Sequence, residues 1–255
     1  MSHKLSATII TLNEEKNIER CITALLPIAD EIIVLDSFST DNTSTICRSL
    51  NVRFEQRKWQ GYAQTKNYLN SLAKYDYIFS VDADEVPDQL LQEAILKEKK
   101  KGFQGVYQVN RKTNYCGNWV LHSGWYPDIK TRIFPKDDVK WEGEFVHETL
   151  SIVGNLPSKL LGGHLLHYSY YTAEEHKQRA DHYSELTAQK LFNQGKKARF
   201  LKPLLSGIGR FFSMYILKLG FLDGKAGWNI AWISAKSNIF KYNTLRKLHH
   251  EKGKS

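Results

Sequence analysis

The chain has 255 residues, of which 42% are hydrophobic and 25% charged, proportions that are typical of a globular protein and exclude wholesale disorder. Lys and Arg number 36 against 27 Asp and Glu, a formal net charge of +9. Such an excess suits nucleic acid, an anionic membrane surface or a phosphorylated substrate, and composition alone does not choose among them. The length allows one large domain, or one domain with an appendage.

The three cysteines, Cys21, Cys47 and Cys116, are scattered without the close spacing of a metal or redox motif. Cys21 and Cys47 lie on the apolar side of helical patterns, so we expect reduced core thiols in a cytoplasmic protein. The chain enters a strand-like segment directly after its first four residues, so no signal peptide is expected. No apolar run reaches the length of a membrane span.

Strands and helices are expected to alternate over the first hundred residues. Strand-like stretches at 7–11, 32–35, 52–54 and 78–81 are separated by apolar residues at helical spacing. This alternation predicts a mostly parallel sheet with helices on both faces. Because right-handed crossovers bring the C-terminal ends of such strands to one edge, Thr11, Asp36 and Asp82 are expected to meet where ligands bind in open α/β folds.

The strand-like run near residue 80 ends in three carboxylates, Asp82, Asp84 and Glu85. Like charges repel, and partly desolvated anions need partners. A divalent cation, Mg²⁺ or Mn²⁺, that carries a polyphosphate would resolve the conflict by taking one or two of these carboxylates. The alternative is an acidic helix start, because Pro87 and an apolar helical pattern follow.

Three polar blocks follow the expected strands in a specific order: Thr11-Leu12-Asn13-Glu14-Glu15, Asp36-Ser37-Phe38-Ser39-Thr40-Asp41-Asn42-Thr43 and Asp82-Ala83-Asp84. Together they resemble family 2 glycosyltransferases, which have the GT-A fold. Later blocks resemble the bacterial branch that glucosylates the inner core of lipopolysaccharide: Trp59-Gln60-Gly61, Trp125-Tyr126-Pro127-Asp128, Arg132-Ile133-Phe134 and Val146-His147-Glu148. The resemblance covers residues 5–170 well and the tail loosely. One departure is Phe38, where the family usually has a glycine.

The resemblance implies a UDP-sugar site at the edge of the sheet. It implies that Asp36 contacts the uracil or ribose, and that the pocket for the nucleotide sugar is lined by Thr11, Asn13, Glu14 and Ala83. A carboxylate suits this role because it accepts hydrogen bonds from N–H and hydroxyl donors. The alternatives are that Asp36 is an ordinary turn residue and that Glu14 only favours a helix N-terminus.

The resemblance also implies how the diphosphate and its metal are held. Asp82 would bind ribose or metal-bound water and is a candidate further metal ligand, and Asp84 would ligate the Mg²⁺ or Mn²⁺ directly. Lys66 would face the donor pyrophosphate, where a compact ammonium neutralises phosphate. The alternative for Lys66 is a solvated lysine on a helix face. His147 is a candidate further metal ligand, although a single histidine is more often structural.

Inverting transfer by direct displacement needs a base for the acceptor hydroxyl and a Lewis acid for the departing diphosphate, and it needs no covalent nucleophile. Asp128 is the favoured base because it lies four residues before Arg132, which resembles the acceptor region of the family. Glu148 is the runner-up, and Glu142 and Glu144 are further candidates. His164 and His167 are less favoured as ligands of one metal, because their spacing on a strand points them to opposite faces.

The segment between the strand-like stretches 106–110 and 131–134 is rich in glycine and aromatic residues. We expect an ordered acceptor loop in which Trp125 and Tyr126 stack on sugar rings, with Arg132 beyond it. The alternative is that these aromatic residues fill a gap in the core.

The tail is expected to be helical. Thr172 to Glu175 form a capping box, and apolar residues from Pro203 onward repeat at three- and four-residue steps with basic residues at their margins. Such a helix can lie in the interface of an anionic membrane; the alternative is a helix that covers the catalytic domain. We therefore predict a GT-A catalytic domain at 1–170 and a C-terminal helical appendage at 171–255.

The function implied by the resemblance is a metal-dependent inverting glycosyltransferase that moves a hexose, glucose from UDP-glucose, to a lipopolysaccharide inner-core sugar. The acceptor would be a lipid-linked saccharide, and the protein would be peripheral at the cytoplasmic face of the bacterial inner membrane. Alternatives are transfer to a polyprenyl phosphate and a non-catalytic nucleotide-sugar-binding membrane protein. A nucleic-acid partner is not expected, because acids at the strand ends would repel phosphates.

Overall fold

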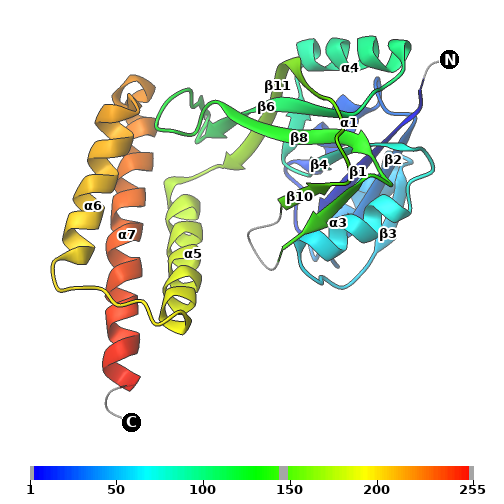
Figure 1. Ribbon diagram of the computed structural model, residues 1–255. Helices are drawn as coiled ribbons and strands as arrows, with labels where there is room; N and C mark the ends of the chain where they lie inside the picture. The colour runs from blue at the N-terminus through cyan, green and yellow to red at the C-terminus, as the bar shows by residue number, and fades with distance from the viewer. Residues whose placement is uncertain (1–2, 144–148, 253–255) are drawn as a thin grey trace. The chain divides into compact units, whose positions relative to one another are not determined.

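The computed structural model describes residues 3–143 and 149–252 (Figure 1). The chain forms two compact units: Met1–Lys112 with Asp128–Tyr168, and Thr113–Pro127 with Ser169–Ser255. The domain boundary expected between residues 170 and 171 stays a prediction. What the pattern did not indicate is that residues 113–127 group with the C-terminal helices.

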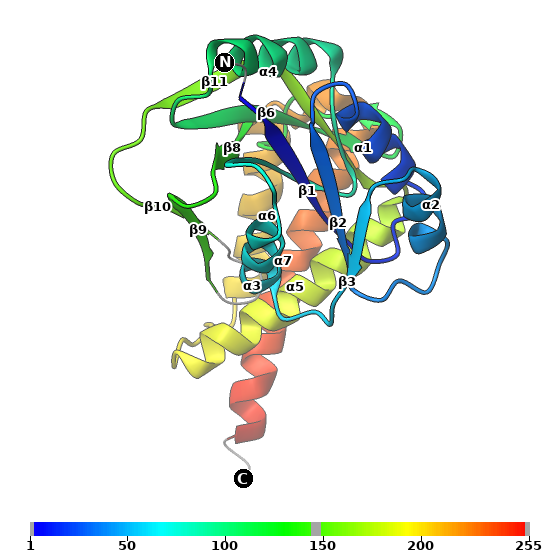
Figure 2. The ribbon, with the colours of Figure 1, turned by 90° about the vertical axis from the view of Figure 1, so that its right-hand side faces the viewer.

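Within the described residues, one nine-stranded sheet has the order β3-β2-β1-β4-β8-β6-β11-β5, with β7 paired to β6. Its first four strands are parallel, and the remaining pairs with a determined register are antiparallel. The parallel strands are β1 (Leu5–Thr11), β2 (Glu31–Asp36), β3 (Arg53–Gln56) and β4 (Tyr77–Asp82). The first three are seen side by side in Figure 2. The others are β5 (Glu85–Pro87), β6 (Val106–Tyr115), β7 (Asn118–Trp119), β8 (Asp128–Pro135) and β11 (Ser158–Tyr170). A separate hairpin joins β9 (Val139–Glu142) to β10 (Thr149–Ile152).

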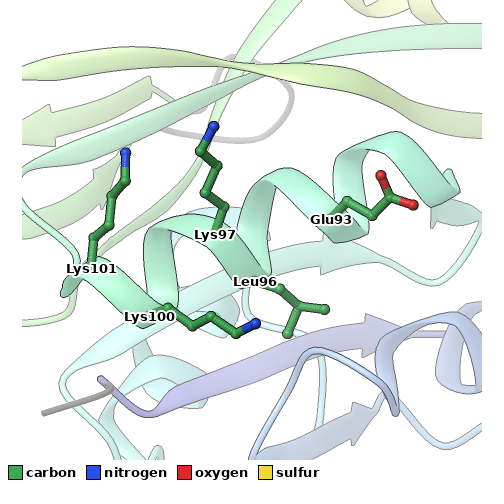
Figure 3. A pocket seen from close by; sticks show the side chains of 5 residues that line it. All are labelled: Glu93, Leu96, Lys97, Lys100 and Lys101. Carbon is green, nitrogen blue, oxygen red and sulfur yellow. The ribbon is translucent and has the colours of Figure 1, made fainter.

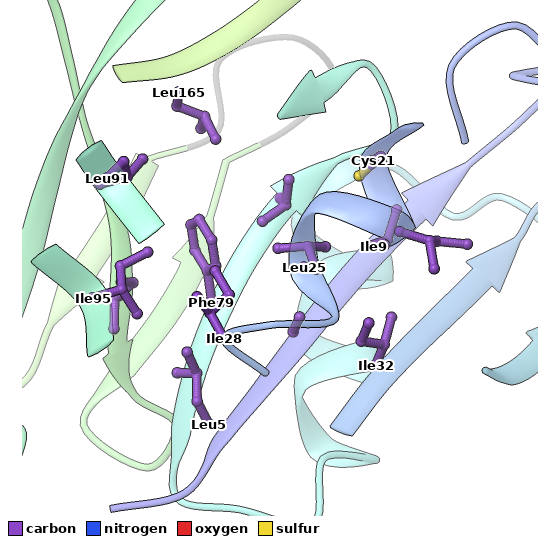
Figure 4. Packing of buried hydrophobic residues seen from close by; sticks show 14 of the residues in the cluster. Leu5, Ile9, Cys21, Leu25, Ile28, Ile32, Phe79, Leu91, Ile95 and Leu165 are labelled. Atoms are coloured by element: carbon purple, nitrogen blue, oxygen red, sulfur yellow. The ribbon is translucent and has the colours of Figure 1, made fainter. Parts of the chain in front are cut away.

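Helices cover both faces of the parallel strands. Alternate residues of β1 point to opposite faces, so Ile9 packs with one set of helices and Ile10 with the other. The first set is α1 (Ile18–Leu25), α2 (Thr43–Ser49) and α4 (Gln89–Lys101), whose core is drawn in Figure 4. The other face carries α3 (Tyr62–Ser71) and the β9–β10 hairpin. Cys21 and Cys47 are free thiols buried in the first core. The α/β class expected from the sequence, with helices on both faces of parallel strands, is confirmed.

The second unit is built on three long helices, α5 (Ala173–Asn193), α6 (Lys202–Phe212) and α7 (Gly224–Lys252). The expected capping box is confirmed, because the Thr172 hydroxyl accepts from Glu175 N and the Glu175 carboxylate from Thr172 N. A π-helical turn, η1 (Ser213–Leu217), and a 3₁₀ turn, η2 (Gly220–Asp223), join α6 to α7. Both α5 and α6 pack along α7. Gly207 permits the α6 contact, since a Cβ there would lie 2.5 Å from Ile239 Cγ1.

Among the described residues, no helix by itself has the length and apolar character needed to cross a membrane. Residues 202–217 and 220–251 pass that test only as a pair, on length and composition, and they are bent by 73°.

Candidate active site

The C-terminal ends of three parallel strands lie side by side. In the register of β1 with β2, Thr11 is opposite Asp36, and in the register of β1 with β4, Ile10 is opposite Asp82. Asp36 is fully buried. The Thr11 hydroxyl is also buried, and it has no hydrogen-bond partner among the described residues. The expected meeting of these strand ends at one edge is therefore confirmed.

Asp36 organises the turn that follows β2. Its carboxylate accepts hydrogen bonds from Ser39 N at 2.9 Å, from the Ser39 hydroxyl and from Gln56 Nε2 at 2.9 Å. Phe38 in this turn has φ 65° and is half exposed. Only glycine adopts this left-handed conformation without a steric cost, which explains why the resemblance leads one to expect glycine there.

The loop after β1 is hydrogen-bonded to the turn after β2. Asn13 N donates to Ser39 Oγ at 2.8 Å, and the Asn13 side-chain oxygen accepts from Thr40 N at 2.8 Å. Glu14 N donates to Thr43 Oγ1 at 2.8 Å, while the Glu14 carboxylate accepts from Asn17 at 2.7 Å. The first two polar blocks thus form one structure, in which Asn13 and Glu14 serve to fix the loops.

A network of ion pairs lies at the end of β4. Lys66 Nζ is 3.0 Å from one Asp82 oxygen, and Arg132 Nη2 donates to the other at 2.8 Å. Arg132 also pairs with Glu85, whose side chain has no exposed surface. Lys66 is 4% exposed, which excludes the alternative of a solvated lysine on a helix face.

Glu85 connects this network to the start of β8. Its carboxylate pairs with Arg111 at 3.2 Å and accepts from Asp82 N at 3.1 Å. Arg111 Nη2 in turn lies 2.7 Å from Asp128, which Lys130 also contacts at 3.0 Å. The repulsion among the acids is therefore relieved in large part by basic side chains of the protein. Arg111 was not predicted as a site residue, and Glu85, one of the three carboxylates expected near a cation, is paired with arginine side chains.

The basic partners set the protonation of two carboxylates. Desolvation would raise the pKa of Asp82, but Arg132 and Lys66 outweigh it and hold that pKa well below its usual range. Desolvation likewise opposes a lowered pKa at Asp128, where Arg111 and Lys130 prevail. Both groups are therefore anions at neutral pH.

Asp84 has a different partner. His167 Nε2 lies 3.1 Å from Asp84 Oδ2, and Tyr168 N donates to the Asp84 carbonyl at 2.9 Å. The antiparallel register of β11 on β5 places His167 opposite Glu85, which brings it to this site. His164 contacts Asp88 instead, at 3.3 Å, so the two histidines reach different carboxylates. No local pattern indicated that His167 is the partner of Asp84.

A carboxylate beside an imidazole suits a divalent metal, because both are ligands that Mn²⁺ accepts. The described residues contain no group of three or more His, Cys, Asp or Glu side chains arranged to hold a metal. Other ligands would have to come from the nucleotide and water. The predicted candidates Glu144, His147 and Glu148 lie outside the described residues.

Trp125 and Arg132, which were expected near the acceptor, make contacts within the protein. Trp125 lies in an aromatic cluster of the second unit, with ring centroids 5.9 Å from Tyr115, 5.8 Å from Tyr170 and 5.5 Å from His176. This packing supports the alternative that Trp125 fills a core. Burial, with a contribution from Arg179, lowers the pKa of His176 to about 4. Tyr126 is half-buried, and Arg132 lies in the ion network.

A hollow of about 400 Å³ lies along α4 (Figure 3). It is lined by Glu93, Leu96, Lys97, Lys100 and Lys101, all from one helix. None of these was predicted as a site residue, and the strand-end acids do not line it. The candidate active site is therefore the edge of the sheet.

Sequence comparisons identify the family of the chain. Residues 6–154 match the family model described as Glycosyl transferase family 2, and the chain belongs to this family. It is a glycosyltransferase. It is 31% identical to an uncharacterized glycosyltransferase of Rickettsia bellii, over 97% of this chain and 88% of that protein. It is 27% identical to the lipopolysaccharide core biosynthesis glycosyltransferase LpsC of Rhizobium meliloti, over 95% of this chain and 94% of that protein.

Solved structures match more partially. Glucosyl-3-phosphoglycerate synthase of Mycobacterium tuberculosis, crystallised with Mn²⁺, UDP-glucose and phosphoglyceric acid, is 24% identical with a TM-score of 0.36. The match covers 44% of this chain and 44% of that chain. The chain thus spans less than half of that structure, and so limited a likeness assigns no ligand here.

Proposed function

We propose that this glycosyltransferase is metal-dependent and inverting, and that it moves a hexose, glucose from UDP-glucose, to a lipopolysaccharide inner-core sugar. The observation that carries the proposal is the meeting of Thr11, Asp36 and Asp82 at one edge of the sheet, with Asp84 immediately beyond. The similarity to LpsC, a lipopolysaccharide core biosynthesis glycosyltransferase, supports the class of acceptor.

The nucleoside would bind at Thr11 and Asp36, beside Ala83, with Asn13 and Glu14 holding the surrounding loops. The buried Thr11 hydroxyl has no partner among the described residues, and a buried polar group is costly unless a ligand or water satisfies it. The Lys66 ammonium, held by Asp82 and 4.6 Å from the centroid of the Trp141 ring, supplies a fixed positive charge for the diphosphate.

Asp84 and His167 would hold the divalent cation. When bound, the metal supplies a Lewis acid for the departing diphosphate. Asp82 was predicted as a further ligand, but both of its oxygens are engaged by basic side chains, so its place is to orient Lys66 and Arg132. In the described part of the chain, the ion pair of Asp84 is made by the imidazole of His167.

Asp128 is proposed as the base that takes the acceptor proton. Its lowered pKa keeps it ionised at neutral pH, and it retains 25% exposure of its side chain. Arg111 and Lys130 orient the carboxylate. Glu148 stays an alternative that the described residues do not address.

The acceptor is proposed to be a lipid-linked saccharide, and the protein a peripheral one at the cytoplasmic face of the bacterial inner membrane. The basic net charge of +9 supports an anionic surface as partner.

A panel of nucleotide sugars with Mn²⁺ tests the donor, with thermal shift and slow donor hydrolysis as readouts. A ligand that binds only the folded protein raises its melting temperature, so UDP-glucose with Mn²⁺ should give the largest shift. The variant Asp84→Asn should lose the Mn²⁺-dependent part of that shift. If UDP-glucose with Mn²⁺ neither shifts the melting curve nor is hydrolysed, the proposed donor is wrong.

A further inference from the structure

The positive charge of the chain is concentrated in its C-terminal helices. Residues 196–250 contain eleven Lys and Arg and a single acid, Asp223, whereas the rest of the chain has 25 basic and 26 acidic residues. The side chain of Asp223 is only 4% exposed and is bound by the loop at 121–123. The surface of α6 and α7 is therefore basic, and its one exposed acid, Glu251 near the end of α7, pairs with Lys247 at 3.8 Å.

One face of α6 exposes an apolar stripe. Leu204, Leu205, Ile208 and Phe212, together with Leu201 at the N-cap, recur at the three- and four-residue steps of one helix face. All five are more than half exposed. We call these five residues the apolar stripe. The opposite face of α6, which includes the buried Pro203 and Gly207, packs on α7.

Apolar exposure continues past the end of α6. Exposed large side chains follow in η1, η2 and the residues beside them: Ile216, Leu217, Leu219, Phe221 and Leu222. The flanking basic residues Lys202, Arg210 and Lys218 are exposed as well. An apolar stripe at helical spacing normally faces a core, and a large exposed patch marks a place of interaction.

We infer that the apolar stripe, with its flanking basic residues, docks on an anionic bilayer surface. The stripe would enter the boundary between headgroups and acyl chains, and the Lys and Arg side chains would reach the phosphates. Charge complementarity selects this occupant, because a soluble partner would have to match ten net positive charges over 55 residues. The inference rests on the proposed function for the lipid-linked nature of the acceptor.

The docking surface, meaning the apolar stripe with its flanking basic residues, is connected to the loop at 113–127 by hydrogen bonds. Asp223 in η2 accepts from Leu121 N at 3.1 Å and His122 N at 3.0 Å, and it pairs with His122 Nδ1 at 2.9 Å. Ser123 N donates to the carbonyl of Lys218 at 2.9 Å. Docking would thus hold the loop that carries Trp125 and Tyr126 near the headgroups, where a lipid-linked saccharide is presented.

Vesicle flotation of the full chain tests the docking. The wild-type protein should float with vesicles of phosphatidylcholine and phosphatidylglycerol, and it should bind vesicles of phosphatidylcholine alone far more weakly. Added salt should release the protein from the anionic vesicles, because it screens the charge of the headgroups. Leu205→Glu should lower the affinity about tenfold, because it places a charge where a Leu side chain would be buried. Leu186→Glu on α5 is the matched control, since Leu186 is also exposed and outside the stripe.

Two further variants test the docking without relying on Leu205→Glu, which could also disturb folding. Arg210→Glu should weaken binding to anionic vesicles about tenfold while leaving the circular dichroism unchanged. Asp223→Asn should speed amide hydrogen exchange at Leu121 and His122, whose N–H groups it binds. Amide exchange at these positions that is unchanged would overturn the joining of loop and docking surface.

The outcomes separate this inference from the proposed function. If Leu205→Glu and Arg210→Glu bind anionic vesicles as well as Leu186→Glu does, the docking surface is wrong even if UDP-glucose and Mn²⁺ bind. If vesicle binding is absent and Leu205→Glu converts a dimer into a monomer, the stripe is a contact between copies of the chain. If the vesicle results hold and UDP-glucose with Mn²⁺ does not bind, only the proposed donor fails.

Discussion

At the strand ends of the first unit, charged side chains are buried, whereas along α6 of the second unit hydrocarbon is exposed. Asp36 and Glu85 have no exposed surface, and Arg132 is 4% exposed, yet Leu205 is 61% exposed. Both regions reverse the usual sorting of polar and apolar groups between surface and core.

The two reversals are stabilised in different ways. The buried charges are compensated inside the protein, through the chain of pairs from Lys66 to Asp128. Among the described residues of the second unit, the hydrocarbon on the outer face of α6 stays exposed, and the proposed bilayer surface would cover it. In this protein, buried charge indicates a preorganised site, while exposed hydrocarbon indicates an interaction surface.

The largest effect is expected from the proposed base. Asp128→Asn should lower transfer by about a hundredfold to ten-thousandfold, the range that general base catalysis contributes. Donor binding, measured by thermal shift with UDP-glucose and Mn²⁺, should stay near wild type. Retained turnover would pass the role of base to Glu148.

The metal assignment is expected to show the next largest effect. Asp84→Ala and His167→Ala should each lower transfer by roughly a hundredfold to a thousandfold, because charge stabilisation of the leaving group is lost. Mn²⁺-dependent UDP binding should fall in parallel, with little change in the melting curve of the free protein. His164→Ala on the same strand is the control, and an equal loss in that variant would contradict the pairing of Asp84 with His167.

Removal of a buried charge should mainly affect stability. Glu85→Gln leaves Arg111 and Arg132 with one carboxylate fewer, so the free energy of unfolding should fall by about 3 kcal/mol. Glu55→Gln is the control, because Glu55 and its partner Arg53 are both 42% exposed and such pairs contribute less than about 1 kcal/mol. Denaturant unfolding measures both, and equal losses would show that the network does not stabilise the fold.

The two units should lose stability over different pH ranges. His176 has a pKa of about 4 in the folded protein against 6.5 unfolded, so folding excludes a proton between these values. Stability from His176 is therefore complete above pH 6.5 and is lost as the pH falls toward 4, by about 3 kcal/mol. The lowered pKa of Asp128 acts at lower pH, since its stabilisation is present above about pH 4 and lost below it.

Unfolding measured at pH 7 and pH 4.5 checks this expectation. His176→Gln should be less stable than wild type at pH 7 but should lose less stability on acidification. His182→Gln, on the exposed side of α5, should keep the wild-type dependence. An unchanged dependence in His176→Gln would show that other groups govern this range.

The smallest effect is expected at Phe38. Phe38→Gly should raise the free energy of unfolding by less than about 1 kcal/mol, because it relieves the left-handed backbone at φ 65° but adds freedom to the unfolded chain. Phe38→Ala keeps the strained backbone and should give no gain. A loss of stability in Phe38→Gly would mean that the ring makes a contact that outweighs the strain.

Local pattern was enough to predict the strands that end in Thr11, Asp36 and Asp82, and the capping box at Thr172. Alternation of strands and helices, together with the right-handed crossover, fixes where parallel strand ends meet. The same pattern showed α6 to be amphipathic, because an apolar stripe is written in three- and four-residue spacing.

The tertiary structure alone decided which side chains are partners. His167 reaches Asp84 only through the antiparallel register of β11 on β5, and the Glu85 pairs join residues 26 and 47 positions apart. Such register and pairing have no local signal in the chain, because they depend on contacts made after the elements have formed. Local sequence patterns were therefore sufficient to predict the elements, their polar ends and the family. Contacts between distant parts of the chain make Arg132 a partner of buried acids and pack Trp125 among aromatic rings. They also leave the apolar stripe of α6 exposed.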